Sequence, residues 1–130
     1  MSAPHTPQSY PPRRPCPCGS RQAYGQCCGP LLSGERFAPT PETLMRSRYS
    51  AHVLRGAAYL QVTWHPSTRP DDADSLPDAV EWLGLSLRRV SGNTVSFTAR
   101  YQARGRHELR ERSTFVQEGG RWFYLSGVEG

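Results

Sequence analysis

All four cysteines of this 130-residue chain lie between positions 16 and 28. Cys16 and Cys18 are separated by one residue, eight residues follow, and Cys27 and Cys28 are adjacent, which gives the spacing C-x-C-x8-C-C. Two glycines between the pairs allow the chain to turn tightly enough to bring the pairs together. The cluster therefore predicts a compact local turn over residues 16–30.

Four thiolates at such short range suit one tetrahedral zinc ion, with zinc–sulfur distances of about 2.3 Å. A site closed by four cysteines is structural, because a catalytic zinc keeps one position open for water. We therefore expect one structural zinc ion held by Cys16, Cys18, Cys27 and Cys28. Two crossed disulfides, redox chemistry and an iron-sulfur cluster remain the alternatives at this point.

The cellular compartment helps to decide between a metal site and disulfides. No apolar run reaches the roughly 20 residues of a membrane span, and the start MSAPHTPQSYPPRRP lacks the apolar segment of a secretory signal. We expect a cytoplasmic protein without a membrane span. In a reducing cytoplasm, closely spaced cysteines more often bind metal than form structural disulfides.

Composition and periodicity divide the chain into three parts. Residues 1–15 hold five prolines and predict a disordered leader, residues 16–30 form the cysteine cluster, and residues 31–130 form an α+β domain. In that domain, Thr40 followed by Pro41 predicts a helix that stops near Gly56, and AAYLQVTW predicts a second, short helix.

From Trp82 onward the hydrophobic period changes to two, and turn residues at 91–93, 104–106 and 118–121 predict four antiparallel strands. Alternation places Leu83, Leu85 and Leu87 on one face of the first strand. On the next two strands, one face carries Val95, Phe97, Ala99 and Tyr101, and then Leu109, Glu111, Ser113 and Phe115. The helices are expected to cover one face of this sheet.

The stretch CPCGSRQAYGQCCGP resembles a SEC-C motif, the zinc-binding unit at the C-terminus of the translocation ATPase SecA, with Cys28 where the SecA version has His. The resemblance extends to LMRSRYSAHVLRGAAYLQVTWHP, EWLGL, VSFTARY and ERSTFVQEGGRWFYLSG, which are similar to the YchJ-like family of bacterial SEC-C proteins. Some relatives carry a second SEC-C motif at the C-terminus, which this chain lacks.

The resemblance implies a cone-shaped domain of the nuclear transport factor 2-like type over residues 31–130, with helices packed on a curved four-stranded antiparallel sheet. It implies a fold and a metal, and no particular chemistry. Because the cone is expected to have a core of its own, we expect chelation to loosen residues 16–30 and leave the cone folded.

Cones of this type often enclose a pocket, and its candidate lining residues are Tyr49, His52, Trp64, His65, Tyr101 and Glu111. His65 and Glu111 are the weak candidates for an acid and a base. A carboxylate at a core-facing position needs a donor, and Arg46 or Arg48 on the first helix could pair with Glu111.

The function that the sequence favours is an interaction or adaptor module that binds another protein through the zinc knuckle. The alternative is a small-molecule enzyme of isomerase, dehydratase or hydrolase type in the cone. Sixteen arginines, no lysine and a net charge of +5 permit weak binding of nucleic acid. No arginine-rich run interleaved with aromatic residues indicates a dedicated nucleic-acid binder.

Overall fold

The segments with period-two alternation form the strands of a sheet, and glycine-containing turns connect these strands. The structure, a computed structural model, describes residues 8–73 and 80–130. Its strands are β1 (Glu81–Ser91), β2 (Thr94–Gln102), β3 (Arg106–Glu118) and β4 (Arg121–Glu129). They form one antiparallel sheet in the order β1-β2-β3-β4, as expected from the three turns.

The helices also follow the local sequence signals. A 3-10 turn η1 (Tyr24–Gln26) and a short α1 (Gly29–Leu32) belong to the cysteine region, and α2 (Pro41–Val53) and α3 (Ala57–Val62) follow. The Thr40 side chain accepts a hydrogen bond of 3.1 Å from the backbone N–H of Thr43, which is the cap that the sequence predicts. The α+β class predicted from the sequence is confirmed.

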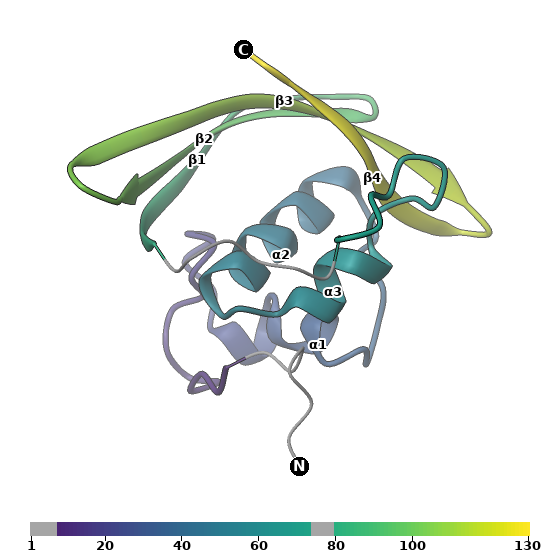
Figure 1. The fold of residues 1–130 in the computed structure, drawn as a ribbon. Helices are drawn as coiled ribbons and strands as arrows, with labels where there is room; N and C mark the ends of the chain where they lie inside the picture. The colour runs from purple at the N-terminus through teal and green to yellow at the C-terminus, as the bar shows by residue number, and fades with distance from the viewer. Residues whose placement is uncertain (1–7, 74–79) are drawn as a thin grey trace.

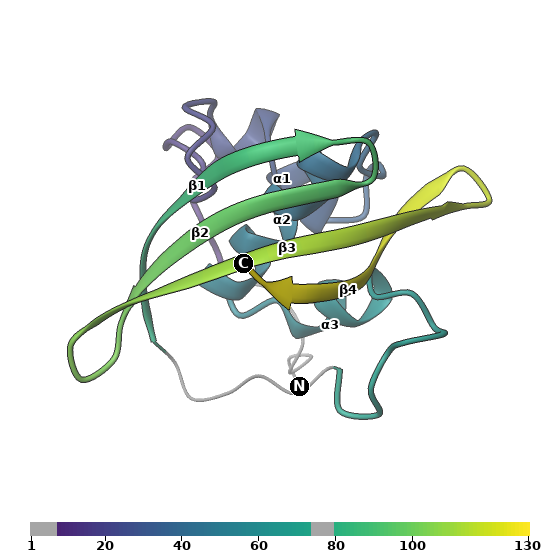
Figure 2. The same ribbon diagram turned by 90° about the horizontal axis from the view of Figure 1, so that it is seen from above.

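The elements form three layers (Figure 1). The curved sheet covers one side of α2 and α3, and the cysteine region with α1 lies on the opposite side of α2. Seen from above, the four strands run side by side over the helices (Figure 2). The helix α2 is therefore covered on both sides, which explains why Ser47, Ser50 and Ala51 on it are fully buried.

One strand departs from simple alternation. The pairing of β1 with β2 shifts between Trp82 and Gly84, so that Leu83 forms a bulge and is 41% exposed. Because a bulge reverses which residues face the core, Trp82 shares the inner face with Leu85. The prediction that Leu83 lies on the same face as Leu85 and Leu87 is wrong for this reason.

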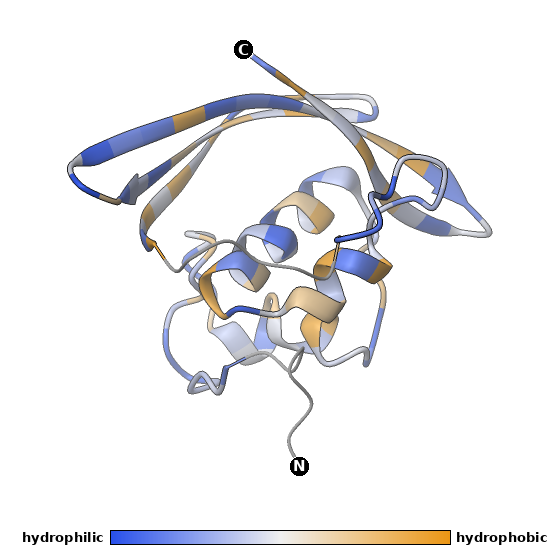
Figure 3. Ribbon diagram, viewed as in Figure 1, coloured by the Kyte–Doolittle hydropathy of each residue, from blue (hydrophilic) through white to orange (hydrophobic). Residues whose placement is uncertain are grey.

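The cysteine region and the cone share one hydrophobic core. Three of the cysteines, together with Leu31 and Leu32 of α1, belong to the same buried cluster as Leu44 and Tyr49 of α2 and Phe97 of β2. Figure 3 shows hydrophobic segments on the helices, and hydrophobic and hydrophilic residues following one another along the strands. The structure therefore differs from the expectation of two separately stabilised parts.

The described part of the predicted leader packs on the cysteine region. The Tyr10 ring lies 5.0 Å from the Tyr24 ring, and Gln8 donates a backbone hydrogen bond to Leu54. Residues 8–15 thus contact the folded part of the chain, while residues 1–7 of the predicted leader lie outside the described residues. In the described parts of the chain, no helix has the length and apolarity to cross a membrane.

Candidate metal centre and cone cavity

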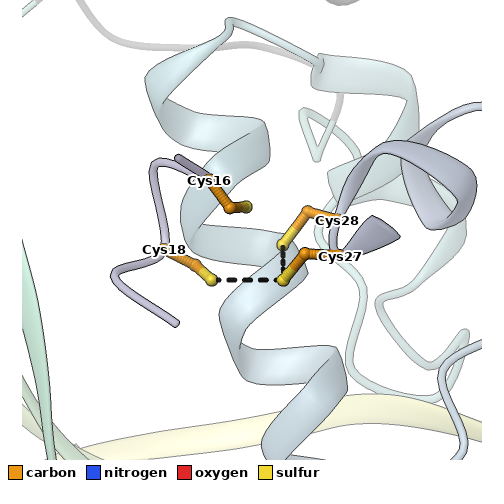
Figure 4. Close-up of side chains that lie close together, drawn as sticks. All are labelled: Cys16, Cys18, Cys27 and Cys28. Atoms are coloured by element: carbon orange, nitrogen blue, oxygen red, sulfur yellow. Dashed lines mark hydrogen bonds between the residues drawn. The ribbon is translucent and has the colours of Figure 1, made fainter. Parts of the chain in front are cut away.

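The four cysteine side chains converge on one point (Figure 4). Their sulfur atoms all lie within 4.8 Å of one another, and the Sγ of Cys27 is 3.6 Å from that of Cys18 and 3.9 Å from that of Cys28. All four are free cysteines. The pairs meet because η1 turns the chain between them, as the intervening glycines predict.

These sulfur separations fit a tetrahedral metal ion. With a metal–sulfur bond of about 2.3 Å, the edge of a tetrathiolate tetrahedron is about 3.8 Å, close to the separations of 3.6 and 3.9 Å. A disulfide instead requires about 2.05 Å between its sulfur atoms. The four cysteines that the sequence indicates as ligands can therefore hold one metal ion.

The ionisation of the cluster leads to the same conclusion. Hydrogen bonds from Cys16 and Cys28 lower the pKa of Cys18 far below the ordinary thiol value, and the same network raises the pKa of Cys28 far above it. Without a cation, these closely spaced sulfur atoms therefore do not all carry a negative charge. Further thiolates at this spacing require a nearby cation, which a metal ion would supply.

The helix α2 supports the cysteine cluster from the cone side. Arg46 donates from Nη1 to the Cys18 carbonyl at 2.9 Å and also forms an ion pair with Glu42 at 3.4 Å. The Ser50 hydroxyl lies 3.6 Å from the Cys16 sulfur. Such contacts orient metal ligands, and here they connect the ligands to the central helix of the fold.

On its other side, the cluster leads directly into α1. Cys28 is the N-cap of this helix, and its carbonyl accepts hydrogen bonds of 3.1 Å from Leu31 and 3.0 Å from Leu32. A helix of four residues is not stable alone. The position of α1 therefore depends on how firmly Cys28 is held.

A second candidate site lies between α2 and the inner face of the sheet. It is a cavity of about 250 Å³. Its lining includes four of the six predicted pocket residues: Tyr49, His52, Trp64 and Glu111. The sequence could place Glu111 there because it is in phase with Ser113 and Phe115.

Two predicted residues are not part of this cavity. His65 lies at the β3–β4 end of the sheet, where its Nε2 is 3.0 Å from Glu118 and its Nδ1 is 2.8 Å from Ser67. Tyr101 packs between Trp82 and His107, with ring centroids at 5.5 and 5.2 Å. The structure therefore does not bring His65 and Glu111 together as an acid and a base.

The hydrogen-bond partners of Glu111 are hydroxyl groups. Its Oε2 accepts hydrogen bonds from Ser113 at 2.7 Å and from Tyr124 at 3.3 Å. Burial, together with the negative charge of Glu111, raises the pKa of Tyr124 to about 12, so the phenol remains a donor. Within residues 8–73 and 80–130, neither Arg46 nor Arg48 forms an ion pair with this carboxylate, contrary to the sequence-based expectation.

Arg48 is nevertheless buried beside the cavity. Its Nη1 donates to the Leu60 carbonyl at 2.9 Å and to the Thr63 hydroxyl at 2.7 Å, and its guanidinium lies 4.5 Å from the centre of the Tyr124 ring. Burial lowers the pKa of Arg48 to about 10, so the group stays charged at neutral pH. Arg48 thereby links α2 to the end of α3 and to β4.

His52 lies one helical turn after Arg48 and also lines the cavity. Burial, assisted by the positive charges of Arg48 and Arg55, lowers the pKa of His52 from 6.5 to about 4. No described residue forms a hydrogen bond with either nitrogen of the His52 ring, which contacts Trp82. The cavity therefore contains a neutral imidazole at physiological pH.

This pKa predicts an acid-sensitive fold. The unfolded chain takes up a proton on His52 near pH 6.5 while the folded chain does so only near pH 4, so stability present above pH 6.5 is lost as the pH falls between these values. Between pH 7 and pH 5 the contribution is about 2 kcal/mol. In denaturant unfolding experiments, the free energy of unfolding of wild type should therefore fall between pH 7 and pH 5 by about 2 kcal/mol more than that of His52→Asn.

Metal release at low pH affects both proteins equally, so the difference between them isolates His52. An identical loss of stability in wild type and His52→Asn would show that the imidazole is not buried in this way.

Sequence reasoning missed the roles of three residues in the cavity region. Arg48 was expected only as an ion-pair partner, and Tyr124 lies on a strand that is apolar on both faces. Gly127 is close enough to Glu111 that any Cβ at this position would overlap the carboxylate. The glycine inside this strand was the signal that could have indicated the close approach.

Comparison with known proteins places the chain among SEC-C proteins. Residues 40–127 match the family model described as the YchJ middle NTF2-like domain, and residues 15–30 match the SEC-C motif. The chain is 51% identical over 131 residues to a UPF0225 protein from Deinococcus radiodurans, covering 99% of this chain and 100% of that protein. A UPF0225 protein from Methylibium petroleiphilum is 51% identical over 119 residues, 87% of each chain.

Two solved structures share the fold. A solution structure of a SEC-C motif containing protein from Rhodopseudomonas palustris has a TM-score of 0.79 at 35% identity, covering 90% of this chain and 99% of that one. A crystal structure of a SEC-C motif containing protein from Psychrobacter arcticus has a TM-score of 0.76 at 26% identity, covering 92% and 84%. The cysteine region and the cone thus occur together in similar proteins.

Proposed function

The chain belongs to the YchJ family of SEC-C motif proteins, the UPF0225 proteins, and from this membership we propose that it is a cytoplasmic zinc-binding adaptor. In this proposal one zinc ion, held by the four cysteines, is structural and stabilises a surface that binds a segment of another protein. Zinc is favoured among the metals because four thiolates in a tetrahedron, without an open position, are typical of structural zinc sites.

The observation that carries the proposal is an apolar groove between α1, α3 and β4. It has a volume of about 220 Å³, and its walls include Leu31 and Leu32 of α1 and Val62 of α3. Phe37 and Val62 at its edge are 59% and 49% exposed, which is unusual for large apolar side chains on one small patch. Exposed apolar patches of this kind often mark interaction sites.

The charges around the groove indicate the kind of partner. Arg36 and Arg121 line it, and the Arg121 guanidinium stacks 4.1 Å from the centre of the Phe37 ring. No acidic residue lines the groove within the described parts of the chain. The proposed partner is therefore a protein segment with an apolar anchor side chain next to acidic residues.

The metal would act on this groove through α1. The ligand Cys28 caps α1, and Leu31 and Leu32 of α1 form one wall of the groove. Fixing Cys28 in a metal centre would thus fix the apolar wall. Loss of the metal would remove binding without any direct contact between the metal and the partner.

Affinity capture from a lysate, with bound segments identified by cross-linking, tests this proposal. Phe37→Ser should weaken binding about 30-fold, as expected for an aromatic side chain that the partner would cover on binding. The matched control is Val90→Ser, because Val90 is 47% exposed on β1 and lies outside the groove. The Cys16→Ser, Cys18→Ser double variant should lose the same partner.

Partners retained equally by wild type, Phe37→Ser and the cysteine variant would contradict the proposal. Capture that disappears after ribonuclease treatment would contradict it as well, because it would identify nucleic acid as the partner. Cross-linked segments without acidic residues would refute the proposed role of Arg36 and Arg121.

A further inference from the structure

The cavity inside the cone is separate from the groove, since the two share no lining residue. We propose that it binds a small, neutral aromatic molecule that carries one hydrogen-bond donor, and that Glu111 accepts this hydrogen bond. The proposal rests on the lining of the cavity and is independent of the zinc centre and of the adaptor role.

The size and walls of the cavity define the class of ligand. At about 250 Å³ it is smaller than the roughly 300–1,000 Å³ of pockets for drug-sized ligands, so it suits a molecule of one or two rings. The walls are largely aromatic and include Tyr49, Trp64, Trp82 and Phe97. Aromatic side chains favour edge-to-face contacts with another ring.

Glu111 provides the directional contact. Both of its hydrogen bonds, from Ser113 and from Tyr124, go to Oε2, and no described residue donates to Oε1. Among the described residues, no buried side-chain oxygen or nitrogen lacks a hydrogen-bond partner. The Oε1 atom, which has no such partner, is therefore not fully buried. The carboxylate is thus held in position by two hydroxyls and keeps one oxygen available to a donor on the ligand.

The charge balance excludes a strongly charged ligand. The buried Arg48 cation and the Glu111 carboxylate both line this cavity, and their charges offset each other. His52 is neutral at physiological pH and adds no charge. A charged ligand would lose its hydration without gaining an unopposed counter-charge, whereas a neutral ring with one N–H or O–H group would not.

Indole and benzofuran test the proposal, because they have nearly the same shape and only indole has an N–H donor. In NMR titrations of the full chain, both should shift the resonances of Trp82, Ala99 and Tyr124 in a saturable way. Indole should bind at least tenfold more tightly than benzofuran, since a hydrogen bond to a charged group contributes about 1.5–3 kcal/mol.

Glu111→Gln should remove most of the preference for indole, because the Gln amide would satisfy both hydroxyl donors only by directing its NH2 group toward the ligand. Glu108→Gln, an exposed change on the same strand, should leave the preference intact. Ala99→Leu should fill the cavity and weaken both ligands.

Absence of saturable shifts for either compound at cavity residues would overturn the proposal. Equal affinities of indole and benzofuran, unchanged by Glu111→Gln, would overturn the role of Glu111. Loss of the preference in Glu108→Gln would do the same.

Discussion

Cys18→Ser is expected to destabilise the whole domain and not only the cysteine region. Cys18 is completely buried, and its cluster shares one core with Leu44 and Phe97. Metal binding contributes about 10–16 kcal/mol in zinc-finger peptides, and domains are stable by only about 5–15 kcal/mol. If removal of one of the four ligands costs about a third of the metal contribution, the free energy of unfolding falls by about 4 kcal/mol. The melting temperature then falls by roughly 10–20 °C.

Thermal unfolding followed by circular dichroism, with the zinc content measured on the same samples, checks this expectation. Gln26→Ala is the matched control, because Gln26 is exposed in the same turn and is not a ligand. The control should keep the metal content and the melting temperature of wild type. A Cys18→Ser protein with a lower zinc content than wild type and the same melting temperature would contradict the expectation.

The second large effect is expected from Arg48→Met. The change removes two hydrogen bonds from a buried cation, to Leu60 and Thr63, and the contact of the guanidinium with the Tyr124 ring. Hydrogen bonds to charged groups contribute about 1.5–3 kcal/mol each, and the methionine recovers part of this by avoiding the burial of a charge. The expected net loss in unfolding free energy is about 3 kcal/mol.

Urea unfolding of Arg48→Met beside Arg89→Met measures this difference, because Arg89 is exposed on β1. The control should remain within about 0.5 kcal/mol of wild type. Equal stabilities of the two variants would show that the desolvation of Arg48 cancels its hydrogen bonds.

Local signals in the sequence predict much of the fold and of the metal centre. The cap at Thr40 and the three glycine-containing turns are short-range features, and they fix where α2 begins and where the strands end. The spacing of the four cysteines likewise predicts a cluster, because the pairs are only eight residues apart. Each of these predictions depends on neighbouring residues alone.

The remaining features depend on packing between distant residues. The bulge at Leu83 arises in the pairing of β1 with β2, and Glu111 meets Ser113 and Tyr124 only after β3 and β4 are aligned. The shared core of the cysteine region, α2 and the sheet likewise joins residues that are far apart in the sequence. A periodicity pattern identifies a buried face and does not show which element covers it.

The central claim is that the metal centre is an integral part of the core of the cone. Amide hydrogen exchange, measured by mass spectrometry with and without a zinc chelator, tests it most directly. The account predicts that chelation removes protection from α2 and from the β2 segment 95–99, as well as from residues 15–32. Loss of protection confined to residues 15–32 would contradict it.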